Sequence, residues 1–85
     1  MTTENANLLE APPGRRLRIA GIAGGETVRR RLLAIGFHRG DVVELDALAI
    51  MNGPLLVHNV SCGSRVALGR GVARKIMVEV VDGGA

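Results

Sequence analysis

The sequence predicts a small, mainly β protein: a closed or nearly closed barrel of about five strands, with one short helix between the first two strands and one helical turn before the last strand. Three observations support this prediction. Short runs of alternating apolar and polar residues recur along the chain, tight-turn signals separate them, and a single segment has helical periodicity. In a chain of 85 residues, one helix cannot cover both faces of an open sheet, so we expect the sheet to curl on itself.

The first strand is expected over residues 16–22, where Leu17 and Ile19 alternate with Arg16 and Arg18. This alternation makes one face of the strand apolar and the other charged. Two consecutive glycines follow the strand and turn the chain toward the helix.

The helix is expected between this glycine pair and Gly36. Val28, Leu32 and Ile35 stand at i, i+4 and i+7, so they share one helical face and are expected to pack on the barrel. Thr27 is placed to cap the N-terminus with its side chain.

Gly36 and Phe37 form the expected end of the helix. Helices often end on a left-handed residue, a conformation that glycine adopts at the least cost, and Phe37 is placed to fold back on Leu32. A turn over residues 39–41, with Gly40 at its centre, then leads into the next strand. We expect Gly36 to be the most sensitive backbone position of the chain.

The remaining elements follow from the same alternation. The expected strands cover 42–50, 55–60, 65–69 and 76–81, and the expected helical turn covers 72–75. The strongest hairpin signal is Asn52-Gly53 followed by Pro54, because Asn-Gly suits a two-residue turn in which both central residues have positive φ.

The composition indicates one domain. We assign residues 1–7 to a loose N-terminal tail, 8–81 to a single domain and 82–85 to a C-terminal tail. Hydrophobic residues make up 47% of the chain, and Phe37 is its only aromatic residue, so we expect an aliphatic core. The single cysteine, Cys62, cannot form an internal disulfide, which indicates a reducing compartment. The sequence has neither a signal-peptide pattern nor an apolar run long enough to cross a membrane, so we expect a soluble, cytoplasmic protein without direct membrane insertion.

The charge is unevenly distributed. The net charge is +3, but all 11 basic residues lie between Arg15 and Lys75 together with only four acidic residues, which gives this span a formal charge of +7. A basic body favours an acidic partner: a nucleic acid, a membrane surface or an acidic protein face. Simple solvation of a small domain explains the arginines equally well.

The helix carries the candidate partner-binding residues. Arg29, Arg30 and Arg31 fall mostly on the side away from the apolar face, and Leu33 is their apolar neighbour. Glu26 is placed to pair with Arg30 at i, i+4. A partner surface and a solvated helix face both fit this pattern, and both interpretations stay open.

Several motifs have the order and spacing of a known family. They are Leu9-x-x-x-Pro13-Gly14, Ile19-x-Gly21-Ile22, Arg30-Arg31-Leu32-x-x-x-Gly36-Phe37-x-x-Gly40-Asp41, Gly53-Pro54-Leu55, Arg65-Val66-Ala67-Leu68 and Ala73-x-x-Ile76-x-Val78. On these motifs, residues 8–81 resemble the FeoA proteins of bacterial ferrous iron transport. The chain departs from the family pattern at Arg39, where proline is usual, and at Gly69 and Gly71, where charged residues are common.

The resemblance implies an SH3-like barrel, which agrees with the fold expected from the residues. It also implies a non-catalytic cytosolic accessory that contacts FeoB, a membrane permease for Fe²⁺, and modulates the GTP-binding domain of that permease. A similar barrel forms the C-terminal domain of metal-dependent repressors of the diphtheria-toxin-repressor type. The alternative function is therefore a small basic barrel that binds nucleic acid or regulates transcription.

The sequence argues against an enzyme, because it contains neither a phosphate-binding G-x-x-x-x-G-K-[ST] loop nor a G-x-S-x-G nucleophile elbow. Nucleic acid is the less favoured partner, because a single phenylalanine cannot supply a surface on which bases stack. A barrel with one open strand edge can pair with a copy of itself, so a weak homodimer also stays open.

His58 and Cys62 are candidate metal ligands, because they lie four residues apart at the end of an expected strand and suit ions such as Zn²⁺. His38 is the remaining histidine and lies in a different turn. Two ligands do not complete a site. We therefore expect no cofactor, and any transition metal such as zinc would be adventitious or shared between two chains.

Overall fold

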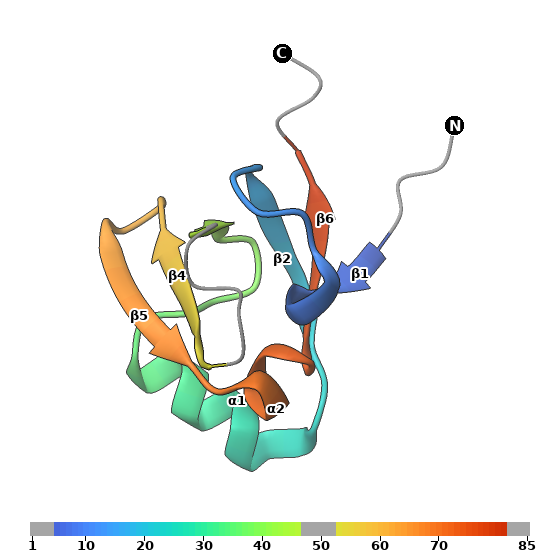
Figure 1. The fold of residues 1–85 in the computed structure, drawn as a ribbon. Coiled ribbons are helices and arrows are strands. Elements are labelled where there is room, and N and C mark those ends of the chain that lie inside the picture. Colours follow the sequence, from blue (N-terminus) through green and yellow to red (C-terminus); the bar gives the residue numbers. More distant parts are fainter. Residues whose placement is uncertain (1–4, 47–52, 82–85) are drawn as a thin grey trace.

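The structure, a computed structural model, describes residues 5–46 and 53–81. In this part of the chain, six strands form one antiparallel sheet in the order β1-β6-β2-β3-β4-β5. Figure 1 shows the sheet curling on itself, with both α-helices at one end. The elements are β1 (Asn5–Asn7), the 3₁₀ helix η1 (Leu8–Glu10), β2 (Leu17–Ile22), α1 (Gly25–Ala34), β3 (Val42–Leu45), β4 (Leu55–Asn59), β5 (Ser64–Leu68), α2 (Arg70–Ala73) and β6 (Ile76–Val80).

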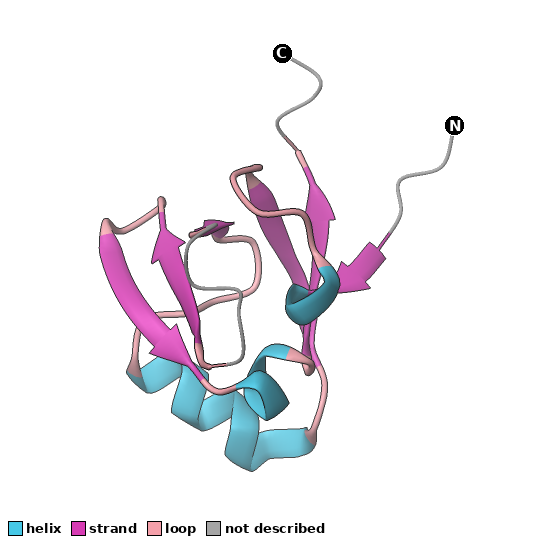
Figure 2. Ribbon diagram, in the orientation of Figure 1, coloured by secondary structure: helices cyan, strands magenta, loops and turns pink. Residues whose placement is uncertain are grey.

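The prediction of a small, mainly β barrel with an SH3-like fold is confirmed. The helix follows the first long strand, as expected, and a short helix precedes the last strand (Figure 2). The short helix begins at Arg70, whereas the sequence predicted a turn over 72–75.

The structure has one strand more than the five that the sequence indicated. Residues Asn5–Asn7, which we assigned to a loose tail, form β1 and pair with β6 in the register Asn5↔Glu79 and Asn7↔Met77. This strand is held by backbone hydrogen bonds to a neighbour that is itself well packed. Its polar residues lack the apolar alternation by which strands are recognised in a sequence.

A single core lies inside the curled sheet. Alternate residues of β3, β4 and β6 point into it, which is the alternation that predicted these strands. The buried apolar residues are Leu8, Ala11, Leu17, Ile19, Leu32, Phe37, Val43, Leu45, Leu55, Val57, Leu68, Ala73, Ile76 and Val78. Among the residues described, Phe37 is the largest fully buried side chain.

The start of α1 differs from the expectation. Gly24, with φ of 96°, is the N-cap, and no side chain caps the helix. Thr27 therefore lies inside the first turn, and its predicted capping role is wrong, because the glycine pair lets the helix begin earlier. The predicted ion pair within the helix is confirmed, since Arg30 Nη2 lies 3.5 Å from Glu26 Oε2.

The inward face of α1 is narrower than predicted. Leu32 is buried and Val28 packs against the core, but Ile35 is 40% exposed. The helix ends at Ala34, and Ile35 is the C-cap with non-helical backbone angles, so the helical spacing no longer directs its side chain inward.

The end of α1 forms as the sequence predicted. Gly36 has φ of 94°, its N–H donates to Leu33 O at 3.0 Å, and the Phe37 N–H donates to Leu32 O at 2.8 Å. These two bonds define a Schellman motif, which satisfies carbonyl groups that the helix leaves without partners. Phe37 and Leu32 are both buried in the same core cluster, as this motif requires.

Ala47 and Asn52 lie outside the described residues, so the predicted hairpin is described only from Gly53 onward. Gly53 and Pro54 are described and directly precede β4. The positive φ that we expected at Gly53 is wrong, because Gly53 is not among the described glycines with that conformation.

Candidate interaction site

A groove opens between α1, the second half of β2 and the turn that follows α1. We call it the α1–β2 groove. It has a volume of about 540 Å³. Its lining residues are Ala20, Gly21, Ile22, Arg29, Leu33, His38 and Arg39.

The backbone of β2 explains why the groove exists. Strand β2 pairs with β3 through Leu17 and Arg18 only. Beyond these two residues, the 38–41 turn pairs with this edge of β2: the Gly40 N–H donates to Ile19 O at 2.8 Å, and the Ile19 N–H donates to Asp41 O at 2.9 Å. The register of β2 against β6 then shifts at a bulge between Ile19 and Gly21. A bulge bends its strand, and the hollow lies beside this one.

The charges that line the groove have one sign. Arg29 and Arg39 contribute guanidinium groups, and in the described part of the chain no carboxylate lines the groove. Arg39 Nε donates to Ala20 O at 3.1 Å, which ties this side chain to the rim of the groove. Within residues 5–46 and 53–81, neither arginine forms an ion pair.

Leu33 supplies the most exposed large apolar side chain of the groove. It is 45% exposed, and with Ile35 it makes up the exposed large hydrophobic residues of the part of the chain described. Beside the two arginines of the groove, this side chain adds an apolar contact to the charged ones.

The 38–41 turn is held by a polar network. Asn59 is fully buried, and its Nδ2 donates to Gly36 O and to Asp41 Oδ2, both at 3.1 Å. The His38 backbone N–H donates to the same Asp41 oxygen at 2.9 Å, and the His38 ring Nδ1 lies 3.4 Å from it. The Asn59 Oδ1 accepts from the Ser61 N–H at 3.0 Å. One buried amide therefore joins the end of α1, the turn and the end of β4.

This network lowers the pKa of Asp41 below the ordinary value of 3.8. Partial burial on its own raises the pKa of this carboxyl, but the hydrogen bonds from Asn59 and from His38 stabilise the charged form and outweigh burial. Asp41 is therefore ionised at neutral pH and completes the network as an acceptor.

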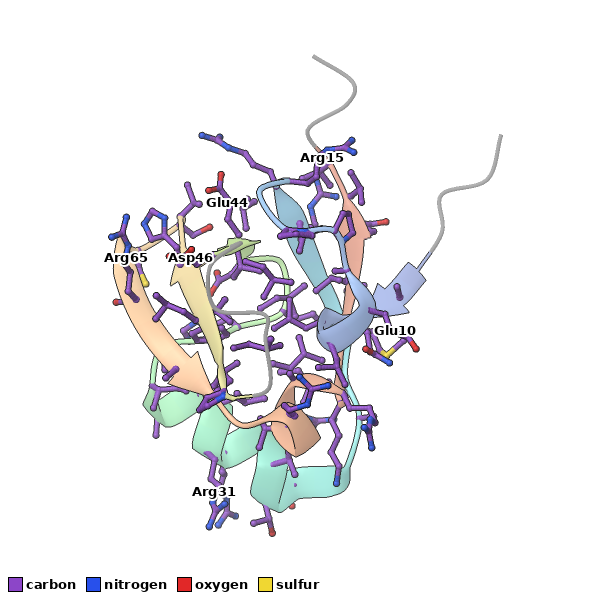
Figure 3. The ribbon with its side chains drawn as sticks, in the orientation of Figure 1. Glu10, Arg15, Arg31, Glu44, Asp46 and Arg65 are labelled. Carbon is purple, nitrogen blue, oxygen red and sulfur yellow. The ribbon has the colours of Figure 1, made fainter. Side chains whose placement is uncertain are left out.

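The candidate partner-binding residues do not all lie on the same side of α1 in the structure. Arg29 and Leu33 line the groove, whereas Arg30 pairs with Glu26 on the outer side of α1. Arg31 projects from α1 away from the barrel (Figure 3). The sequence analysis did not identify Arg39 as part of this surface, although its departure from the family pattern was a usable signal.

The candidate metal ligands do not converge. His38 lies beside Asp41, His58 on β4 is flanked by its strand partners Glu44 and Arg65, and Cys62 is exposed. No group of three or more potential metal-binding side chains occurs among the described residues. The arrangement therefore offers no metal centre within the described part of one chain.

A second, smaller hollow of about 160 Å³ lies over β3, β4 and β5. Glu44, Asp46 and Arg65 gather there (Figure 3), together with His58. Acidic and basic groups alternate across this face, and Arg16 Nε lies 3.3 Å from Glu44 Oε2. The charges of this face are balanced, unlike those of the α1–β2 groove.

None of the helices in the described ranges has the length and apolarity that a membrane crossing requires. The fold and the groove together define an SH3-like barrel that presents a basic, partly apolar surface.

Comparison with known proteins identifies the family. The model of the FeoA domain matches residues 6–80. A Methanocaldococcus jannaschii protein, named as an Fe(2+) transport protein A, is 34% identical over 74 residues, which cover 87% of this chain and 85% of that protein. The chain belongs to the FeoA domain family, so the resemblance seen in the sequence is confirmed.

Solved structures agree with this assignment. The NMR structure of a FeoA-like protein from Clostridium acetobutylicum has a TM-score of 0.77 at 27% identity, over 95% of this chain and 91% of that chain. A manganese-dependent transcriptional repressor in complex with manganese has a TM-score of 0.81 at 23% identity, over 95% of this chain and 39% of the repressor. This second likeness concerns the fold alone.

Proposed function

We propose that this protein is a cytosolic accessory of ferrous iron uptake that acts by direct contact with FeoB, the membrane Fe²⁺ permease, and thereby modulates its GTP-binding domain. The FeoA family has a role in Fe(2+) uptake and consists of non-catalytic transport accessory proteins. A contact surface, not a reaction centre, is therefore the feature to look for on this chain.

The α1 surface supports the proposal most directly. Leu33 is exposed between cationic neighbours on a helix that is otherwise anchored by Leu32 and by the Phe37 bond to its last turn. A rigid helix with an exposed apolar side chain and arginines presents the residue types that dominate protein interfaces. We assign the contact to Arg29, Arg30, Arg31 and Leu33.

An NMR titration tests this function. The ¹⁵N-labelled protein would be mixed with the soluble GTP-binding domain of the cognate permease at low and at moderate salt. We expect saturating shifts that are confined to α1 and its groove, and we expect L33S to weaken binding. R65Q is the matched control, because Arg65 is an exposed cation on β5, away from α1.

The likeness to a repressor fold raises nucleic-acid binding as a second candidate. Contacts to phosphates weaken steeply between low and moderate salt, whereas a contact that depends on an apolar side chain weakens little. Saturating binding of duplex DNA at moderate salt, with no binding of the permease domain under the same conditions, would replace the proposal by this alternative.

A further inference from the structure

We propose that the α1–β2 groove binds an acidic segment of the protein partner, with carboxylates paired to Arg29 and Arg39 and an apolar side chain packed on Leu33. The inference rests on the proposed function in one respect, since the segment is taken to belong to the iron-transport partner. It adds the chemistry of that segment and includes Arg39, which lies outside α1.

The charge environment favours an anionic occupant. Other arginines of the barrel form ion pairs with carboxylates. Among them are Arg16 with Glu44 and Arg18 with Glu79, both at 3.3 Å, and Arg30 with Glu26 at 3.5 Å. Arg29 and Arg39 share one hollow, and no described carboxylate lines it. Two guanidinium groups beside the same hollow raise its positive potential, and each can bind a carboxylate through two parallel hydrogen bonds.

The groove is held in shape before a partner arrives. The Nε bond from Arg39 to Ala20 O fixes the stem of this side chain, and its terminal nitrogens are left for a ligand. The 38–41 turn, which carries Arg39, is fixed on both sides. The Gly40 N–H donates a hydrogen bond to Ile19 O, and the Asn59 side chain donates one to Asp41 Oδ2. A pre-formed site loses little conformational entropy on binding, so weak ion pairs contribute more to affinity.

The apolar side chain of the occupant distinguishes this proposal from simple charge attraction. Leu33 is 45% exposed, and Ile22 on the opposite wall is only partly buried. The volume of about 540 Å³ lies within the range of sites that enclose small ligands, so the groove can hold a short segment but not a folded domain. An anionic membrane surface would not enter such a hollow.

A short peptide is a sufficient probe. The ¹⁵N-labelled protein would be titrated with the capped pentapeptide Asp-Asp-Leu-Asp-Asp, with Asp-Asp-Ser-Asp-Asp as the control for the apolar contact. We expect saturating shifts at Ala20, Ile22, Leu33 and Arg39, and weaker binding of the serine peptide.

Variants test the named arginines. R29Q and R39Q should each weaken binding about threefold to fivefold, which corresponds to about 0.7–1 kcal/mol, the upper part of the range for an exposed ion pair. R39K, which keeps the charge but lacks the Nε donor to Ala20, should fall between the wild type and R39Q. R65Q is the matched control and should leave the affinity unchanged. The spectra of the free variants show whether each one is folded.

Three outcomes would overturn the inference. They are shifts spread evenly over surface cations, equal binding of the leucine and serine peptides, and equal affinity of R29Q, R39Q and R65Q. Sedimentation with phosphatidylglycerol vesicles that depends on the same arginines, without peptide binding, would also overturn it in favour of a membrane surface.

A competition experiment separates this inference from the proposed function. If the permease domain binds and the leucine peptide displaces it, both are supported. If the domain binds at another face and the peptide does not compete, the groove inference fails while the proposed function stands. If the peptide binds in the groove and the domain does not bind at any concentration tested, the proposed function fails and the assignment of the segment to that partner fails with it.

Discussion

Replacement of Asn59 by aspartate would test whether the buried polar network holds the groove turn in place. The side chain keeps its size and its Oδ1, which still accepts from Ser61, but it loses the Nδ2 donor to Gly36 O and Asp41 Oδ2. Because no cavity is created, the change isolates two hydrogen bonds and adds a negative charge.

The expected cost follows from these two bonds. A neutral hydrogen bond contributes about 1 kcal/mol and one to a charged group about 1.5–3 kcal/mol, so N59D should lose about 2.5–4 kcal/mol of unfolding free energy at neutral pH. The new carboxylate also faces Asp41, whose oxygen lies 3.1 Å from the nitrogen that it replaces. For a domain of this size, such a loss lowers the Tm by roughly 10–32 °C.

The pH dependence of the unfolding free energy provides a sharper test, because the carboxyl groups change it in opposite directions in the wild type and in N59D. In the wild type, the lowered pKa of Asp41 stabilises the fold above the unfolded value of 3.8, and this stability is lost as the pH falls through the folded pKa. In N59D, two adjacent carboxyls share one proton, so one folded pKa is raised above its unfolded value. At low pH the shared proton removes the repulsion between the two carboxyl groups. As the pH rises through the raised pKa, both groups become charged and their repulsion destabilises the fold.

Urea unfolding followed by far-UV circular dichroism measures both effects, since the chain has no tryptophan or tyrosine. We expect the gap between wild type and N59D to narrow between neutral pH and about pH 4. The double variant N59D/D41N should recover part of the loss, because it exchanges the amide and the carboxylate. A67D is the control for an added surface charge, at a cost below about 1 kcal/mol. A gap under about 1 kcal/mol at neutral pH, or one that widens on acidification, would refute the reasoning.

Three further predictions concern individual positions. G36V should lower the unfolding free energy by about 1–3 kcal/mol, because the left-handed backbone at Gly36 is strained for valine, whereas R30A removes one exposed ion pair of about 0.3–0.5 kcal/mol; equal thermal midpoints would contradict this order. F37A should cost about 3–5 kcal/mol in urea unfolding because Phe37 is fully buried, and a value near 1 would mean that the core collapses around the gap. Cys62 is exposed, so iodoacetamide should modify it fully in the native state without altering the circular dichroism spectrum; protection from the reagent would show that the thiol is covered.

Local features of the fold were predictable from the sequence because their causes are local. The Schellman motif needs one glycine and one apolar residue at fixed positions, and Gly36 and Phe37 supply them. The alternating burial of β3, β4 and β6 follows from strand geometry in the same way. Ile35 was misjudged because the rule of helical spacing was extended one residue past the end of α1.

The groove and its support were not predictable, because they join residues far apart in the sequence. Arg39 reaches Ala20 across 19 positions, and Asn59 reaches Gly36 across 23. An asparagine at the end of a strand gives no sign in the sequence that it is buried. Two of the seven described lining residues, Arg29 and Leu33, were nevertheless proposed from their place on the helix. Their assignment to a partner stays a prediction.

The strand order has a consequence for synthesis of the protein. Strand β6, the last of the six to leave the ribosome, lies between β1 and β2, the first two. While β6 is still in the exit tunnel, β1 has no neighbour and β2 has one bare edge. The nascent chain can therefore assemble only the meander from β2 to β5. The barrel is completed after translation of the domain, when β6 inserts between β1 and β2. A ribosome that stalls before Ile76 would hold a chain with an open edge, the kind of species that chaperones bind and that aggregates.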